Sequence, residues 1–324
     1  MTESREIKIV YLSHLNEEQR RQIEAVAPGV SVRVARSEKE AWEDLPGAEV
    51  VASLGWEFSR EAFVRAKKLR WIHSLSAGVD ALFYPEFIAS EVRLTNSRGV
   101  YDIPVAEHAF ALLTCLTRGI DRFHKNQAEH KWARSPVTEM DGQVLGIIGL
   151  GSIGREIARK AKTAYNMKVI ATKKRLSEAV PHVDVLLPVS EMDKLLAESD
   201  FVVVAAALTE ETTGLIGEKE LKSMKPTAYI VNIARGRIIQ SHAIMKALHQ
   251  GWIAGAGLDV TDPEPLPPDS ELYDTPNLII TPHMAASALA HKHVTRSLNV
   301  FINNLKSYLK DEQMPTYVDK IRRY

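Results

Sequence analysis

The sequence predicts an α/β protein of two domains, each built around a doubly wound parallel sheet. Short apolar runs alternate with amphipathic helical stretches along most of the chain, a pattern typical of parallel sheets. A glycine-rich turn from Gly149 to Gly154 follows one of these runs in mid-chain. A long amphipathic helix, predicted over Ser287–Lys310, follows the last run without a further strand. The 324 residues suffice for two domains of ordinary size.

The first hundred residues predict one small α/β unit. Its first helix covers Glu17–Ala27 and ends at Pro28-Gly29, a pair that interrupts helices. A longer helix is predicted after the unit, over Asp102–Phe123. Apolar runs predict four strands: Ile7–Leu12, Val30–Val34, Glu49–Ser53 and Trp71–Ser74.

A second series of strands and helices begins at Val144. Helices such as Glu191–Ala197 and Ser241–His249 fill the gaps between its strands. Six strands with intervening helices fit a doubly wound nucleotide-binding fold. The predicted strands are Val144–Ile148, Lys168–Ala171, Phe201–Ala205, Ala228–Asn232, Ala254–Leu258 and Leu278–Thr281.

The C-terminal helix has no strand partners of its own, so we expect it to cross back and pack on the first unit. The first domain is then discontinuous, and the two crossings form a hinge. The prediction is two Rossmann-like domains: a substrate domain from residues 1–100 and 286–324, flavodoxin-like, and a dinucleotide-binding domain from residues 101–285.

The glycine-rich turn predicts a dinucleotide site. Gly149 allows the tight turn, Gly151 lets a pyrophosphate approach the backbone, and Gly154 lets the following helix pack on the strand. Ser152 and Ile153 complete the loop at the start of that helix, whose N-terminus presents free N–H groups to phosphates. An ordinary strand–helix turn is the alternative interpretation.

The end of the next strand predicts which dinucleotide binds. NAD-binding proteins usually place an acidic residue there for the ribose 2′-hydroxyl. This chain has instead Thr172, Lys173, Lys174 and Arg175, and its next carboxylate is Glu178. Cations and a hydroxyl suit a 2′-phosphate, so NADP(H) is favoured and NAD(H) remains possible. The alternative interpretation is a solvated charge run.

Three residues in the second half of the chain predict what the cofactor is used for. Arg235 follows a predicted strand, where its guanidinium can hold a carboxylate and polarise the adjacent carbonyl. His283 also follows a strand and can donate a proton to a carbonyl oxygen. Glu264, in a proline-rich loop, can pair with His283 and favour the imidazolium. Together they predict hydride transfer between a dinucleotide and a 2-keto or 2-hydroxy acid.

The chain resembles the D-isomer-specific 2-hydroxyacid dehydrogenase family over nearly its whole length. The segments that carry the resemblance, besides the glycine loop, are Ser76-Ala-Gly-Val-Asp80, Val105-Ala-Glu-His108, Leu208-Thr-Glu-Glu-Thr212, Asn232-Ile-Ala-Arg-Gly236, Gly257-Leu-Asp259 and Thr281-Pro-His283.

The resemblance implies a role for each matching residue. Arg235, Glu264 and His283 take the family's catalytic roles, and Arg235 and His283 also contact substrate. Asp259 matches the aspartate near the nicotinamide carboxamide, and Ile233 joins the cofactor site. Ala77 and Gly78 match the loop whose backbone N–H groups receive the substrate carboxylate. Lys173 stands at the position that is acidic in most members of the family. This departure makes the chain similar to the family's NADPH-using members, such as glyoxylate/hydroxypyruvate reductases.

Two departures from the family's pattern lie near the proposed site. Ala207 replaces the usual proline of one turn, and Met284-Ala-Ala-Ser287 follows His283 where glycine is common. A relative on the same fold, formate dehydrogenase, has glutamine where Glu264 stands, which argues against that activity. The predicted activity is a 2-ketoacid reductase that forms a D-2-hydroxy acid. The alternative is a non-catalytic, dinucleotide-responsive binding protein like the family's corepressor members.

The composition and the spacing of residues argue against nucleic acid, membrane and metal as binding partners. The 41 basic residues balance 41 acidic ones, so no overall attraction to nucleic acid or anionic membrane is expected. Cys115 is the single cysteine, which excludes an intrachain disulfide. Two histidine pairs, His124 with His130 and His291 with His293, lack further ligands nearby, so no metal is expected.

Location and assembly are predicted from the same sequence. The N-terminus lacks the apolar segment of a signal peptide, and no run approaches the roughly 20 apolar residues of a membrane span, so the cytoplasm is expected. The region around Trp132 corresponds, by resemblance, to an arm exchanged between subunits, which predicts a homodimer.

Overall fold

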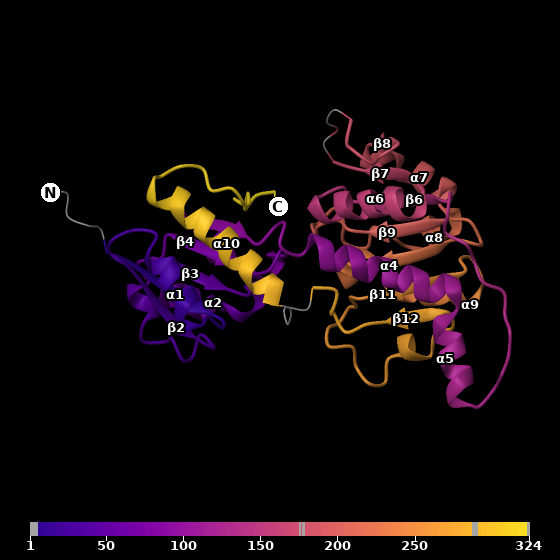
Figure 1. The fold of residues 1–324 in the computed structure, drawn as a ribbon, viewed down its shortest axis with the longest axis horizontal. Coiled ribbons are helices and arrows are strands. Elements are labelled where there is room, and N and C mark those ends of the chain that lie inside the picture. The colour runs from indigo at the N-terminus through magenta and orange to yellow at the C-terminus, as the bar shows by residue number, and fades with distance from the viewer. Residues whose placement is uncertain (1–5, 175, 177–178, 287–290, 323–324) are drawn as a thin grey trace. The chain divides into compact units, whose positions relative to one another are not determined.

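The computed structural model describes residues 6–174, 176, 179–286 and 291–322. The chain divides into two compact units (Figure 1). The first, here unit 1, comprises Met1–Tyr101 and Ala288–Tyr324, and the second, unit 2, comprises Asp102–Ser287.

Unit 1 contains a five-stranded, fully parallel sheet. The strands are β1 (Ile7–Leu12), β2 (Val30–Ala35), β3 (Val50–Ser53), β4 (Trp71–Ser74) and β5 (Arg93–Asn96). Their spatial order is β2-β1-β3-β4-β5, which is the flavodoxin-like order. The register aligns Ile7 with Val30 and Val50 with Trp71.

Helices cover both faces of this sheet. On one face, Ile23 of α1 (Glu17–Glu24) and Phe301 of α10 (His291–Leu309) pack into a core with Trp71. The rings of Trp71 and Phe301 stack with centroids 5.4 Å apart. On the other face lie α2 (Arg60–Arg65) and α3 (Pro85–Ile88). The last helix thus packs on the first sheet; its predicted start, residues 287–290, lies outside the described residues.

Unit 2 contains a seven-stranded parallel sheet of order β12-β11-β10-β9-β6-β7-β8, the Rossmann order extended by one strand. The order of the strands along the chain reverses between β6 and β9: β7 and β8 lie on one side of β6, and β9 to β12 lie on the other. Ligands bind at such switch points. The strands are β6 (Val144–Ile148), β7 (Lys168–Thr172), β8 (Val185–Leu187), β9 (Phe201–Val204), β10 (Tyr229–Asn232), β11 (Gly255–Leu258) and β12 (Leu278–Ile280).

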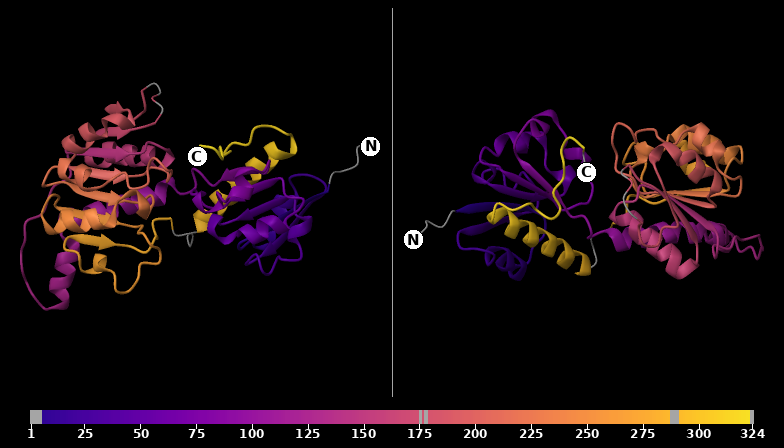
Figure 2. Two further views of the ribbon diagram at one scale, coloured as in Figure 1. Left: turned by 180° about the vertical axis from the view of Figure 1, so that it is seen from behind. Right: turned by 90° about the horizontal axis from the view of Figure 1, so that it is seen from above.

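The sheet of unit 2 lies between two helical layers (Figure 2). One layer contains α4 (Asp102–Arg118) and α6 (Ser152–Tyr165). The other contains α7, α8 and α9, which cover Met192–Glu198, Glu218–Ser223 and Ser241–His249, and packs on the strands through a continuous aliphatic core. Because both faces are covered, the strands are almost entirely apolar.

The structure differs from the sequence prediction at three elements. The helix predicted over Asp102–Phe123 is two helices, because Gly119 takes a left-handed conformation (φ 63°) between α4 and α5 (Ile120–Ala128). Strands β5 and β8 were not predicted. Both are short: β5 has Arg93 and Asn96 at its ends, and β8 is an apolar run of only three residues, Val185–Leu187.

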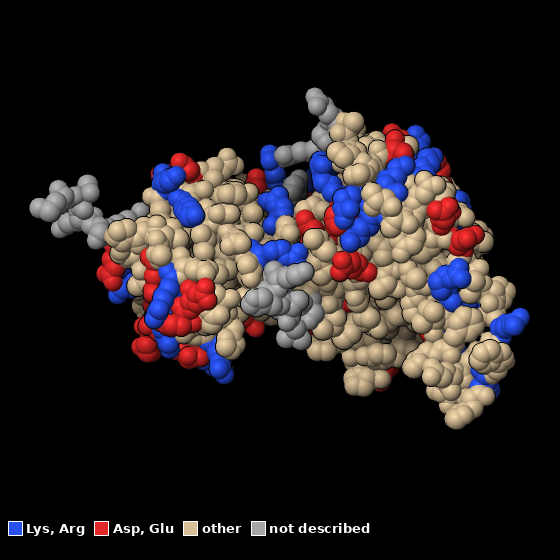
Figure 3. Space-filling view, viewed as in Figure 1, with Lys and Arg blue, Asp and Glu red and all other residues tan. Residues whose placement is uncertain are grey.

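Acidic and basic side chains are interspersed over the face drawn in Figure 3, in keeping with the zero formal net charge. Within the described ranges, no helix is both long and apolar enough to cross a membrane.

Candidate active site

Three of the predicted site residues follow neighbouring strands at one edge of the unit 2 sheet. Arg235 lies beyond the end of β10, Asp259 directly follows β11, and His283 lies beyond the end of β12. The strands pair in parallel in this order, so their carboxyl ends lie side by side. The residues therefore share the edge at which open α/β sheets bind ligands.

Glu264 and His283 form a hydrogen-bonded pair. His283 Nδ1 lies 2.8 Å from Glu264 Oε2, and both side chains are about two-fifths exposed (41% and 37%). The other carboxylate oxygen, Oε1, accepts the backbone N–H of Thr261 at 2.9 Å. Because a carboxylate accepts, Nδ1 carries a proton, and Nε2 is the ring nitrogen left for chemistry. His283 Nε2 makes no hydrogen bond to the described part of the chain.

The turn after β10 fixes Arg235. Buried Asn232 donates from Nδ2 to the Arg235 carbonyl (2.9 Å) and accepts the N–H of Ala234 (3.0 Å). Next to it, Gly236 packs directly on the backbone of Thr261: a Cβ there would lie 2.0 Å from the Thr261 carbonyl. The Arg235 turn and the Glu264 loop are therefore held together, and any side chain at Gly236 would separate them.

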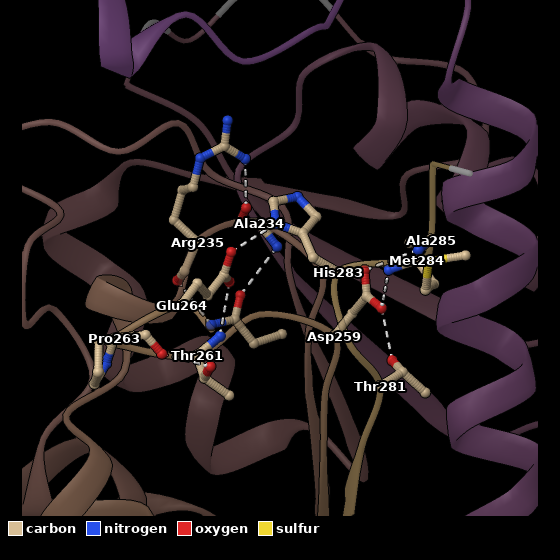
Figure 4. Close-up of polar contacts among 11 residues, drawn as sticks. Ala234, Arg235, Asp259, Thr261, Pro263, Glu264, Thr281, His283, Met284 and Ala285 are labelled. Carbon is tan, nitrogen blue, oxygen red and sulfur yellow. Dashed lines mark hydrogen bonds and ion pairs between the residues drawn. The ribbon is translucent and has the colours of Figure 1, made fainter. Parts of the chain in front are cut away.

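Figure 4 shows the side chains of Arg235, Glu264 and His283 beside one another, with Asp259 to one side of His283, next to Thr281. A guanidinium and an imidazole with one unbonded nitrogen stand together at the sheet edge. The arrangement can hold an anion and exchange a proton with a neighbouring oxygen.

Asp259 is a buried carboxylate, 1% exposed. Burial by itself raises the pKa of its carboxyl, but hydrogen bonds outweigh this and hold the pKa below its usual range. The donors are His108, the Thr281 hydroxyl (2.6 Å) and the backbone N–H groups of Ala285 and Met284 (2.9 Å each). Asp259 is therefore ionised at neutral pH.

The glycine loop has the shape that a dinucleotide needs. Gly149 has φ 97°, and a Cβ there would lie 2.6 Å from the backbone of Ala206, beyond the end of β9. A Cβ at Gly154 would lie 2.5 Å from the Gly149 carbonyl, whereas one at Gly151 would meet no atom within 4 Å. Gly151 directly precedes the first turn of α6, whose N–H groups have no acceptor within the helix, so these residues could hold a pyrophosphate.

The remaining cofactor residues take different positions. Ser152 Oγ donates to Asp102 Oδ1 at 2.9 Å. Ile233 and Thr172, also predicted to contact the cofactor, are buried (7% and 1% exposed), so the Thr172 hydroxyl is not accessible.

In the cationic run, Lys174 Nζ lies 3.1 Å from Glu211 Oε1. Hydrogen bonds from Thr209 and Lys174 lower the pKa of Glu211 to about 2, so this partner is charged. Lys173 is half-buried and forms no ion pair within the described ranges, and Arg175 lies outside them.

In unit 1, the loop after β4 turns its carbonyls inward. The Ser76 carbonyl accepts from Ser97 N, the Ala77 carbonyl from Asn96 Nδ2 (2.7 Å), and the Gly78 carbonyl from Ser76 Oγ (2.7 Å). In a trans peptide the C=O and the following N–H point in opposite directions. The N–H groups of Ala77, Gly78 and Val79 therefore point away from these partners, and none bonds to another described residue.

Among the residues with described positions, no group of three or more histidine, cysteine, aspartate or glutamate side chains could hold a metal ion.

Comparisons with known proteins identify the family. Residues 110–285 match the family model described as D-isomer specific 2-hydroxyacid dehydrogenase, NAD binding domain. The glyoxylate reductase of Pyrococcus furiosus is 33% identical over 315 residues, which cover 90% of this chain and 92% of that protein. The chain belongs to the D-isomer-specific 2-hydroxyacid dehydrogenase family. It is therefore an oxidoreductase that uses a nicotinamide dinucleotide and acts on 2-hydroxy and 2-keto acids.

Solved structures agree with this assignment to the dehydrogenase family. A D-isomer specific 2-hydroxyacid dehydrogenase from Xanthobacter autotrophicus, in complex with NADPH and MES, has a TM-score of 0.84 and 27% identity, with 99% of this chain and 100% of that chain covered. An NADPH-dependent glyoxylate/hydroxypyruvate reductase from Sinorhizobium meliloti, in complex with NADP and sulfate, has a TM-score of 0.83 and 25% identity, with the same coverage.

Several residues that shape the site of this dehydrogenase were not predicted from sequence. Asn232, Thr261, Asn96 and His108 act by holding other residues in place. A weak signal existed for Asn232, a polar residue that ends an otherwise apolar strand. Thr261 precedes Glu264 by three residues, but only the fold reveals that its N–H binds the carboxylate.

Proposed function

We propose that the protein reduces small 2-ketoacids of the glyoxylate/hydroxypyruvate type to D-2-hydroxy acids with NADPH. The observation that carries the proposal is the His283 imidazole, which Glu264 holds through Nδ1 beside Arg235, while Nε2 bonds to none of the described residues. The names and cofactors of the relatives support the substrate class and the use of NADPH.

Each residue has one task in the proposed reaction. Bound NADPH supplies the hydride that reduces the substrate carbon. Arg235 holds the ketoacid carboxylate and polarises the adjacent carbonyl. Protonated His283 donates from Nε2 to the carbonyl oxygen, and Glu264 stabilises the imidazolium and keeps Nε2 directed at the substrate. In oxidation, neutral His283 accepts the proton from the hydroxyl group.

The proposal is tested by mixing the protein with each cofactor and a panel of 2-ketoacids. We expect NADPH oxidation with at least one small ketoacid. The alternative, a corepressor-like protein, predicts dinucleotide binding without turnover across the whole panel. None of the relatives described above is named as a corepressor.

We propose that the outward N–H groups of Ala77 and Gly78 bind the substrate carboxylate. Asn96→Asp replaces the donor to the Ala77 carbonyl by an acceptor, which repels that carbonyl and disturbs the loop. The KM for the ketoacid should rise about tenfold, the loss of about one hydrogen bond to a charged group, while the Kd for NADPH is unchanged. Asn303→Asp, the same change on an exposed face of unit 1, is the control. Equal KM values in the two variants would contradict the assignment.

We propose that Lys173 favours NADPH by pairing with its 2′-phosphate. Lys173→Asp should lower the ratio of kcat/KM for NADPH to kcat/KM for NADH roughly 5- to 150-fold. This corresponds to a loss of about 1–3 kcal/mol in the preference for NADPH. Lys219→Asp makes the same charge change on exposed α8 and should leave the ratio unchanged. A wild-type preference for NADH would overturn the inference from the cationic run.

We propose that the protein is a homodimer joined through α5 and the segment that follows it. Helix α5 contains no buried residue, Ile120 is 53% exposed, and Trp132 is 96% exposed. Sedimentation should give about twice the 36.2 kDa chain mass. Trp132→Glu should raise the dissociation constant of the dimer at least about tenfold, since buried aromatic residues dominate interface energies. Trp56→Glu, an equally drastic change at an exposed site of unit 1, should not. A wild-type monomer at micromolar concentration would exclude this assembly.

A further inference from the structure

His108 belongs to the segment Val105–His108, to which the proposed reaction gives no task. It lies on α4, and its side chain is only 22% exposed. Its Nε2 is 2.9 Å from Thr281 Oγ1 and 3.2 Å from Asp259 Oδ1. We infer that His108 is a positioning residue: its Nε2–H fixes Thr281 and Asp259, and through them the loop that carries His283. The inference rests on the proposed role of His283.

The hydrogen-bond pattern settles which nitrogen of His108 carries the proton. The Thr281 hydroxyl has a single hydrogen, which it donates to Asp259 Oδ1 at 2.6 Å. Thr281 Oγ1 can then only accept from His108, and the Asp259 carboxylate also only accepts. Both contacts of Nε2 therefore require Nε2–H. A neutral ring with Nε2–H and a protonated ring meet this requirement equally.

Asp259 carries the effect of His108 to His283. Its carbonyl accepts the N–H of His283 at 2.7 Å, and its side chain accepts the N–H groups of Met284 and Ala285, the next two residues. His283 itself has φ 53°, a left-handed conformation that surrounding contacts must impose on a residue other than glycine. The Asp259 carboxylate accepts the hydrogen bonds that hold Met284 and Ala285, and His108 donates to the same carboxylate from α4.

The connection spans elements far apart in the sequence. His108 and Thr281 are 173 residues apart, so α4 is tied to the segment after β12 by one side chain. Without His108, the buried carboxylate loses one of its donors, and Thr281 Oγ1 loses the donor that it accepts from. A displacement of His283 by about 1 Å is enough to cost roughly 10²-fold in rate. Loss of His108 should therefore act on catalysis more than on substrate binding.

Three substitutions at His108 separate positioning from general packing. The amide nitrogen of Gln can reach the place of Nε2, whereas that of Asn reaches only the place of Nδ1, and Leu has no donor. We expect His108→Leu and His108→Asn to lower kcat about 10- to 100-fold, with KM for the ketoacid changed less than about threefold because Arg235 still holds the carboxylate. His108→Gln should regain most of the lost kcat.

A second measurement does not depend on activity. Hydrogen–deuterium exchange of the free protein should speed up at the amides of Met284 and Ala285 in His108→Leu and return toward the wild-type rate in His108→Gln. His249→Leu is the matched control, because the His249 ring bonds, among the described residues, only to the Met245 carbonyl one turn away on α9. It should change neither exchange at these amides nor kcat.

The inference is overturned if Gln and Asn behave alike, if KM rises while kcat stays constant, or if exchange at Met284 and Ala285 is unaltered in His108→Leu. The exchange outcome is independent of the proposed function, whereas the kcat and KM outcomes require it. That proposal fails instead if His283→Ala keeps full activity, whereas the exchange result for His108 stands in either case.

Discussion

His283→Ala is expected to reduce the rate of ketoacid reduction by about 10²–10⁴-fold, the usual contribution of a general acid. Glu264 holds the His283 ring through Nδ1, Nε2 has no partner in the part of the chain that the structure describes, and alanine leaves no proton donor at that place. The measurement is kcat/KM from NADPH oxidation at constant pH. Added imidazole should restore part of the activity if the loss is that of a proton donor.

Cofactor binding provides the control for this substitution. NADPH fluorescence titration should give the wild-type Kd, because the glycine loop follows β6 and His283 follows β12. His242→Ala removes an exposed histidine of α9 and should leave the rate unchanged. If His283→Ala binds NADPH normally and still turns over at the wild-type rate, another group donates the proton.

The sheet of unit 2 illustrates how much of the fold is readable from sequence. Val202, Val203 and Val204 of β9 are completely buried, so the strand is a continuous apolar run and was predicted. Strand β8 is also apolar, but it has only three residues, all of them partly exposed at the sheet edge, and so short a run was not recognised as a strand. The break at Gly119 was missed because a single glycine is compatible with a continuous helix, and the sequence does not show that this one takes φ 63°.

The site shows the same division between local and distant effects. Arg235, Glu264 and His283 were predicted because each stands in a distinctive local context at or near a strand end. Residues that hold them are defined by contacts across the fold. Asn96 reaches back 19 residues to the Ala77 carbonyl, and His108 reaches 173 residues forward to Thr281. Nothing near Asn96 or His108 in the sequence indicates these partners.

Arg235→Ala is expected to lower kcat/KM for the ketoacid at least about 10²-fold. The substrate carboxylate would lose a bidentate guanidinium partner, and hydrogen bonds to charged groups contribute about 1.5–3 kcal/mol each. The loss should appear in both kcat and KM, because Arg235 is proposed both to bind the carboxylate and to polarise the carbonyl. Arg235→Lys should recover little, since an ammonium group cannot replace the planar fork.

Arg237 gives a matched control two residues further along the chain. It is exposed, and its backbone carbonyl, which accepts the N–H of Gly214, is unaffected by substitution of the side chain. Arg237→Ala should therefore keep the wild-type kcat/KM. Guanidinium ions added to Arg235→Ala should raise its activity, whereas sodium ions at equal ionic strength should not. If Arg235→Ala and Arg237→Ala lose activity equally, the loss reflects the net charge near the site, and the carboxylate must be held by another group.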